Sequence, residues 1–239
     1  MKNIEKWQPS IIYKVGDEFK VNYGHISYRS RLAVKLSIGH YISKIREYAN
    51  GNLLDLGCGT VPYYEVYKDL VDDVKCTDWE NSMHVDSHLD VVSNLNEAIN
   101  FKDKEFDTII FTDVLEHLSR PELVMSEINR VLKKGGIVVL AVPFIYNIHE
   151  EPHDIARYTR FGIADLAEKS GLEVVEIEEI GGALTIIGDI LGKIIPIKSL
   201  SILVQWLFGM LLKTRIALYL ENKTKKKLTR SYLAILRKE

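Results

Sequence analysis

The residues whose types and spacing best suit ligand binding follow a short apolar segment. The stretch NLLDLGCGTVPYY, residues 52–64, contains Asp55 and then two glycines, Gly57 and Gly59. Glycines here let the backbone turn tightly and approach a ligand closely. A dinucleotide-binding loop would have a third glycine where Pro62 stands, and a P-loop would continue with Gly-Lys-Ser or Gly-Lys-Thr. The loop therefore suits a nucleoside better than a pyrophosphate.

An acid lies at the distance expected of a ribose ligand. Asp78 comes near the end of a second apolar segment, DVKCTDW, 21 residues after Gly57. In Rossmann-type folds, an Asp or Glu about 20 residues after the glycine loop hydrogen-bonds the ribose hydroxyls. A lone acid after a strand is usually a turn residue, but behind a glycine loop the ribose role is the better explanation.

A third polar group lies in YNIHEEPHDIARYT, residues 146–159. It contains HEEPH, His149 to His153, which matches the H-E-x-x-H pattern of zinc proteases. That pattern binds zinc because a continuous helix puts both histidines on one face. Pro152 removes a helical N–H and disfavours helical backbone at the preceding residue. We therefore treat the zinc-protease match as chance and expect no metal site, leaving open only a divalent ion held by this loop during catalysis.

The pattern of elements predicts the scaffold that brings these loops together. Nearly continuous apolar segments alternate with helical ones, which is typical of a parallel sheet covered on both faces. We expect an α/β, doubly wound, Rossmann-like fold with seven mainly parallel strands and an antiparallel last strand. The expected strands lie near 52–56, 73–79, 89–92, 106–112, 137–144, 172–182 and 231–239, and helices near 29–48, 63–70, 120–136 and 160–171. Ligands bind beyond the carboxyl ends of such strands.

Composition and charge limit the possible classes. The chain of 239 residues is 46% hydrophobic, enough for one sizeable core. Its two cysteines and polar N-terminus favour a reducing cytoplasm. From residue 193 onward, eleven Lys and Arg face two acids, a net charge of +9, so the remainder carries −11 of the total −2. A basic tail on an acidic body indicates an anionic contact or a solvated surface.

Together, these motifs resemble those of class I S-adenosylmethionine-dependent methyltransferases of the type 11 subgroup. The likeness lies in LLDLGCGT, Asp78, FDTIIFTDVLEHL, LKKGGIVVLAVPF and EPHDIARYT, and covers roughly residues 52–182 plus the last strand. The arm WQPS, the run DWENS and the HEEPHDIARYT loop are most similar to methyltransferases of bacterial surface-glycan clusters. The resemblance implies one domain, residues 1–239, with an N-terminal arm and helix (1–50), a cofactor-binding core (51–182), a helical insertion (183–227) and a final strand (228–239).

The resemblance also implies a cofactor site. Asp55, Gly57 and Gly59 would face the methionine and ribose parts of S-adenosylmethionine. The remaining expected ligands are Asp78 for the ribose diol, Trp79 against adenine, Asn94 at an adenine edge where the family has an acid, and Thr112 and Asp113 beneath the methionine. His117, in VLEHL, is expected to pack in the interior.

Methyl transfer to a hydroxyl benefits from alignment and from a base. We favour His153 as that base, because an imidazole titrates near neutral pH. Asp154 is the second choice, or it orients the histidine. An ion pair of Asp154 with Arg157 is the alternative. The expected reaction is O-methylation of a sugar or lipid-linked glycan. Other small molecules or lipids remain open, as do a nicotinamide oxidoreductase and a non-catalytic module.

The expected helical insertion has an unusual composition. SLSILVQWLFGMLL, between Lys198 and Lys213, has no charge and is apolar on every side. Such a helix must be buried in protein or lipid, yet 14 residues are too few to span a bilayer. We expect residues 199–220 to make a peripheral contact with the inner face of the membrane or a homodimer interface, and we expect no nucleic-acid partner.

Overall fold

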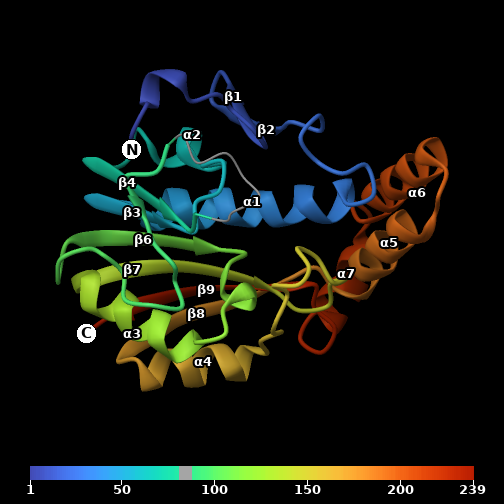
Figure 1. Ribbon diagram of the computed structural model, residues 1–239. Coiled ribbons are helices and arrows are strands. Elements are labelled where there is room, and N and C mark those ends of the chain that lie inside the picture. The colour runs from blue at the N-terminus through green and yellow to red at the C-terminus, as the bar shows by residue number, and fades with distance from the viewer. Residues whose placement is uncertain (81–87) are drawn as a thin grey trace.

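A seven-stranded sheet runs through the middle of the protein in the computed structural model, which describes residues 1–80 and 88–239 (Figure 1). The strand order is β5-β4-β3-β6-β7-β9-β8, and β9 runs antiparallel to both of its neighbours. The strands are β3 (Asn52–Leu56), β4 (Asp73–Asp78), β5 (Val91–Val92), β6 (Phe106–Thr112), β7 (Leu132–Pro143), β8 (Leu172–Ile180) and β9 (Ser231–Lys238). The predicted Rossmann-like fold with an antiparallel last strand is confirmed. The last two residues of the DWENS run, 81 and 82, lie outside the described residues.

Helices cover both faces of the sheet, because the strand side chains are apolar on both faces. One core joins the sheet to α1 (Arg31–Tyr48) and α2 (Tyr64–Tyr67), and the other joins it to α3 (Pro121–Val131) and α4 (Arg160–Lys169). Within β6, Ile110 faces the first core, whereas Ile109 and Phe111 face the second. This alternation is the period of two that a strand imposes.

The N-terminal arm is more ordered than the sequence suggested. It contains the turn η1 (Ile4–Lys6) and a hairpin of β1 (Ile12–Val15) and β2 (Glu18–Val21), which form a separate two-stranded sheet. The strands expected from the sequence begin only at residue 52, so this hairpin was missed. Ile12 is the one fully buried residue of β1 and β2, so they lack the alternating apolar pattern that reveals a strand.

The boundary between α3 and β7 also differs from expectation. The helix expected over 120–136 ends at Val131, and β7 begins at once with Leu132. Gly135 therefore lies inside the strand, with φ of +77°, and the register of β7 against β6 shifts between Phe106 and Thr108. A glycine with positive φ in a strand is typical of a bulge. Thr159 is the N-cap of α4, since its hydroxyl accepts a hydrogen bond from Gly162 N.

Residues 183–227 contain three helices, α5 (Ala183–Ile194), α6 (Lys198–Leu211) and α7 (Arg215–Thr224). They stand beyond the carboxyl ends of the parallel strands, at the right of Figure 1. The helices interlock through polar groups, because Glu221 of α7 accepts hydrogen bonds from Gly182 N, Thr185 N and Thr185 Oγ1 at the start of α5. The N–H groups of a first helical turn need such acceptors.

Helix α6 is polar on its inner side and apolar on its outer side. Ser201 and Gln205 are buried, and the Gln205 amide accepts from Leu32 N and donates to Tyr28 O. The exposed outer residues include Leu203 and Trp206, whose exposed fractions are 48% and 59%. The sequence could not show this inversion, because 11 of the 14 residues between Lys198 and Lys213 are neither Ser nor Gln.

No single described helix is long and apolar enough to cross a membrane, although α6 and α7 together meet that measure as a pair bent by 93°.

Replacing Glu221 tests the link between α7 and α5. We expect Glu221→Ala to lower the free energy of unfolding by about 1–3 kcal/mol, because it leaves partly buried N–H groups without an acceptor. Urea denaturation followed by circular dichroism would measure this. The neighbouring exposed Asn222→Ala is the matched control. Equal effects of the two substitutions would contradict the capping role.

Candidate active site

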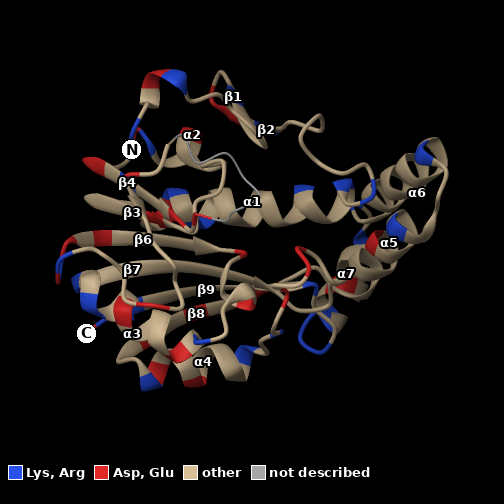
Figure 2. Cartoon of the chain, viewed as in Figure 1, with Lys and Arg blue, Asp and Glu red and all other residues tan. Residues whose placement is uncertain are grey.

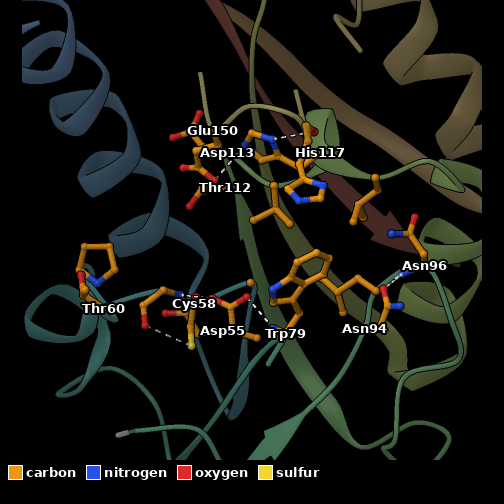
Figure 3. A pocket seen from close by; sticks show the side chains of 18 of the residues that line it. Asp55, Cys58, Thr60, Trp79, Asn94, Asn96, Thr112, Asp113, His117 and Glu150 are labelled. Atoms are coloured by element: carbon orange, nitrogen blue, oxygen red, sulfur yellow. Dashed lines mark hydrogen bonds and ion pairs between the residues drawn. The ribbon is translucent and has the colours of Figure 1, made fainter. Parts of the chain in front are cut away.

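A cavity of about 520 Å³ opens at the carboxyl edge of the sheet (Figure 3). That volume lies within the usual range for small-molecule sites. Residues from the loops after β3, β4, β5, β6 and β7 line it. Eight lining residues are those expected from the sequence to bind cofactor, namely Asp55, Gly57, Gly59, Asp78, Trp79, Asn94, Thr112 and Asp113. The structure therefore brings all of them together.

The glycine loop is held by the end of β4. Gly57 N and Cys58 N both donate to Thr77 O, and Gly59 N donates to Asp78 Oδ2 at 2.8 Å. Gly57 has φ of +74°, and a Cβ there would lie 2.5 Å from Val114 Cγ2. The position thus requires glycine both for its backbone conformation and for the close approach of the next loop.

Asp78 shapes the loop as well as facing the cavity. Its second oxygen, Oδ1, accepts from Trp79 N at 2.8 Å. Charge-assisted bonds from two backbone N–H groups fix the direction of the carboxylate. The acid at the predicted offset is therefore oriented before any ligand arrives.

Two further acids on the cavity wall have perturbed protonation. Burial raises the pKa of Asp55 to about 7, although the Tyr67 hydroxyl donates to Asp55 Oδ2 at 2.7 Å and opposes the shift. Burial and then repulsion from the Glu116 carboxylate raise the pKa of Asp113 to about 7. A cationic ligand beside these carboxyl groups would lower both pKa values and so favour the negatively charged forms.

Asp113 also has a strained backbone. Its φ is +56°, a conformation that costs energy for a residue with a Cβ, and Glu150, which also lines the cavity, has φ of +52°. Asp113 N donates to Ala141 O, and Tyr41 donates to Asp113 Oδ1 at 3.3 Å. These bonds hold the carboxylate at the mouth of β6, where Figure 3 shows it beside Thr112.

Trp79 and His153 meet edge to face, with ring centroids 5.1 Å apart. They come from two different loops of the cavity, the loop after β4 and the loop after β7. The buried Trp79 Nε1 has no hydrogen-bond partner among the residues that the structure describes. Such a donor fits a site that a polar ligand completes.

Asp154 has a different role from the one expected. Its side chain is 2% exposed and accepts hydrogen bonds from Arg157 and from His149 N and Nδ1. Bonding to Arg157 lowers the pKa of Asp154. Orientation of His153 by Asp154 is therefore wrong, and the alternative ion pair with Arg157 is what the structure contains. His153 itself lines the cavity.

Asn94 lies in a local turn at the cavity edge. Its Oδ1 accepts from Asn96 N, and its Nδ2 donates to Glu97 Oε1. Asn96, which the sequence did not single out, accepts from Ser119 N, Ser119 Oγ and Arg120 N. These bonds tie the loop after β5 to the loop after β6, and no local pattern in the sequence signals them.

The N-terminal arm forms part of the site. Ile11 lines the cavity, Trp7 Nε1 donates to Val61 O, and Thr60 Oγ1 donates to Ser10 Oγ. The residues of the WQPS run therefore pack on the glycine loop. The sequence indicated that this run belongs to the arm but gave no sign of what it packs against.

The loop after β7 is also fastened to the helices α5–α7. The Lys193 ammonium lies 3.7 Å from the centroid of the Tyr146 ring, and the Arg230 guanidinium lies 4.7 Å from it. Arg230 also donates to Ser37 Oγ of α1 at 3.0 Å. Cations over an aromatic face are attracted by its quadrupole, so one ring joins the loop to α5 and to the start of β9.

Comparison with known proteins gives a family match over part of the chain. Residues 54–140 match the family described as a methyltransferase domain. An uncharacterized protein of Methanocaldococcus jannaschii is 30% identical over 96 residues, which cover 38% of this chain and 45% of that protein. The chain therefore matches less than half the length of this curated relative.

Solved structures agree on the fold. A methyltransferase of Archaeoglobus fulgidus described as SAM dependent has a TM-score of 0.57 and 18% identity, with 87% of this chain and 95% of that chain covered. A chain from the Haloferax volcanii complex of the Trm112 methyltransferase activator with a methyltransferase gives 0.58 and 17%, covering 88% and 93%. Residues 54–140 thus form a methyltransferase domain with the fold of the class I, S-adenosylmethionine-dependent methyltransferases.

Proposed function

We propose that the protein transfers a methyl group from S-adenosylmethionine to a hydroxyl of a sugar or lipid-linked glycan. The observation that supports this most is the cavity itself, which the glycine loop, Asp78 and His153 all line. A cofactor side and an acceptor side within one cavity are what an in-line transfer requires.

The cofactor side of the cavity suits a nucleoside with a cationic tail. Asp78, with its carboxylate already oriented, can accept from ribose hydroxyls, and the Trp79 indole offers both an aromatic face and a free N–H. Asp55 and Asp113 supply negative charge near a sulfonium. S-adenosylmethionine provides the activated methyl group, and the residues hold and orient it.

On the acceptor side, His153 takes the proton. The acceptor O–H bond breaks as the O–CH₃ bond forms, and the electron pair of the S–CH₃ bond remains on sulfur, which leaves neutral. Proton removal by a positioned base typically contributes ~10²–10⁴ in rate. Polar residues near His153, among them Ser119, Glu150 and Glu151, line the same cavity and favour an acceptor rich in hydroxyls.

The alternative acceptors are another small molecule or a lipid. A nicotinamide oxidoreductase is disfavoured by Pro62 and by the family match, and a non-catalytic module by the oriented Asp78 and by His153 opposite it. Transfer of a labelled methyl group from S-adenosylmethionine to nucleotide sugars and lipid-linked saccharides tests the proposal. Cofactor binding without transfer to any hydroxyl compound would overturn it.

The outer face of α5–α7 supports a membrane location for this reaction. Leu203, Trp206, Leu207 and Met210 of α6 are exposed, and Ile216 of α7 is 76% exposed. Lys and Arg gather beside them in the loop after α7 and near the ends of α6 (Figure 2). Exposed apolar side chains flanked by basic ones are typical of a surface that lies in an anionic membrane interface. We propose that this face contacts the cytoplasmic side of the membrane.

Asp78 should determine cofactor affinity. We expect Asp78→Ala to weaken binding of S-adenosylhomocysteine by about 1–3 kcal/mol, since charge-assisted hydrogen bonds are lost. Isothermal titration calorimetry measures the change. The exposed Asp165→Ala on α4 is a control of equal charge. Binding that is indifferent to Asp78 would contradict the assigned ribose contact.

His153 should affect turnover more than affinity. We expect His153→Ala to reduce kcat by ~10²–10⁴, whereas calorimetry should show little change in S-adenosylhomocysteine affinity. His25→Ala, a substitution in the N-terminal arm, is the matched control. Full activity of His153→Ala would show that the acceptor proton leaves by another route.

Membrane contact should depend on the outer face of α6. We expect salt-sensitive co-sedimentation with anionic liposomes that is lost in the double variant Leu203→Ser, Trp206→Ser. Phe208 is less suitable for this test, because its ring packs against Gly188 of α5. Phe161→Ser, which removes a 75% exposed ring from α4, is the control. A dimeric protein that ignores liposomes would instead assign this face to a subunit interface.

A further inference from the structure

Three potential metal ligands meet beside the cavity. Glu116 and His117 end the short turn η2 (Leu115–His117), and His149 comes from the loop after β7. One ligand atom from each residue lies within 4.8 Å of the others. Glu116 Oε1 is 3.7 Å from His117 Nε2 and 3.6 Å from His149 Nε2. Figure 3 shows His117 on the cavity wall, near Asp113 and Glu150.

Glu116 is the unusual member of this group. Its exposed fraction is 0%, and neither carboxylate oxygen has a hydrogen-bond partner among the described residues. Burying a carboxylate without hydrogen bonds is costly unless a positive charge compensates it. Arg157, a cation in the same loop as His149, is already bonded to Asp154. The carboxylate therefore requires a positive charge that the two imidazoles or an ion must supply.

Both imidazoles are oriented as metal ligands are. His117 Nδ1 lies 3.2 Å from His153 O, and His149 Nδ1 lies 3.2 Å from Asp154 Oδ2. A carbonyl and a carboxylate only accept hydrogen bonds, so each Nδ1 carries the proton. When the rings are neutral, each Nε2 then carries a lone pair, and both Nε2 atoms lie near Glu116 Oε1. Hydrogen bonding of the second ring nitrogen to a carbonyl or carboxylate is typical of metal-bound histidines.

We propose that Glu116, His117 and His149 bind a divalent transition-metal ion, with Zn²⁺ as the reference ion. Two imidazoles and a carboxylate are a known zinc ligand set, and imidazole disfavours Mg²⁺ and Ca²⁺. Ligand atoms around tetrahedral zinc are roughly 3.4 Å apart for bonds of about 2.1 Å. The two measured separations from Glu116 exceed this by only a few tenths of an ångström. Glu150 Oε2, 3.8 Å from His117 Nε2, lies on the cavity side of the group.

This site differs from the one spelled by HEEPH. His149 takes part, but His153 instead uses its backbone oxygen to orient His117. The site itself does not depend on the proposed function. If that function holds, an ion at the cavity wall would lower the pKa of an acceptor hydroxyl and assist its deprotonation by His153.

Zinc binding to the full-length protein tests the proposal. After removal of metal with a chelator, equilibrium dialysis with Zn²⁺ and elemental analysis should give one ion per chain. We expect Glu116→Gln and His149→Ala each to weaken binding by more than tenfold. His153→Ala, which keeps the backbone oxygen, should bind zinc normally. The d–d spectrum of Co²⁺ in place of zinc would report coordination by nitrogen and oxygen.

Several results would overturn the site. Stoichiometric binding that survives both Glu116→Gln and His149→Ala would place zinc elsewhere. Absence of binding by the wild type, with His149 detected as an imidazolium by nuclear magnetic resonance, would leave a simple ion pair with Glu116. Calorimetry with S-adenosylhomocysteine on the same samples verifies folding of the variants. If the wild type fails to bind that ligand but binds zinc, the proposed function fails and the metal site stands.

Discussion

The hydrogen bonds that pair β3 with β4 on one side and with β6 on the other determine where every loop of the site begins. Leu56 pairs with Thr77, and Asp55 pairs with both Cys76 and Ile110. Because the three strands are parallel and in register, their carboxyl ends reach the same edge together. The glycine loop, Asp78 and Asp113 leave the sheet within a few residues of that edge, which is why one cavity can contain all three.

The cofactor side of the site was predictable because its information is local. A glycine loop after one strand and an acid after the next are placed by the sheet, whatever else the chain does. The acceptor side was not predictable in this way. Asp154 lies next to His153 in the chain but bonds to His149 and Arg157, and the irregular backbone between Pro143 and Arg160 offers no period from which to infer directions. Glu116 gave no signal either, because its importance comes from complete burial.

The fold likewise contains features with a local sequence signal, which were predicted, and features that depend on distant contacts, which were not. Strands with continuous apolar residues were located correctly, whereas the hairpin of β1 and β2 was missed because most of its side chains face solvent. The position of Trp7 against Val61 depends on a contact between residues 54 positions apart. For α6, composition predicted a helix that needs an apolar environment, but only the structure shows that its two buried polar residues face the protein and its apolar side chains face outward.

Negative charge accumulates where the cavity meets the sheet. Asp55, Asp78 and Asp113 line it, and Glu116 lies just behind. Burial, aided by repulsion between carboxylates, raises the pKa of Asp55 and that of Asp113 to about 7. Such a wall favours a cationic cofactor over a neutral thioether product, so charge alone helps exchange one for the other after each turnover.

The ring of Tyr146, held between Lys193 and Arg230, has a mechanical consequence. Lys193 lies in the last turn of α5, and Arg230 comes directly before β9. The chain therefore holds the loop after β7 both before α6 and after α7. A force that tilts α5–α7 must either move the loop or break the stacking. A displacement of α5–α7 would thereby reach the loop after β7, which contains His149 and His153.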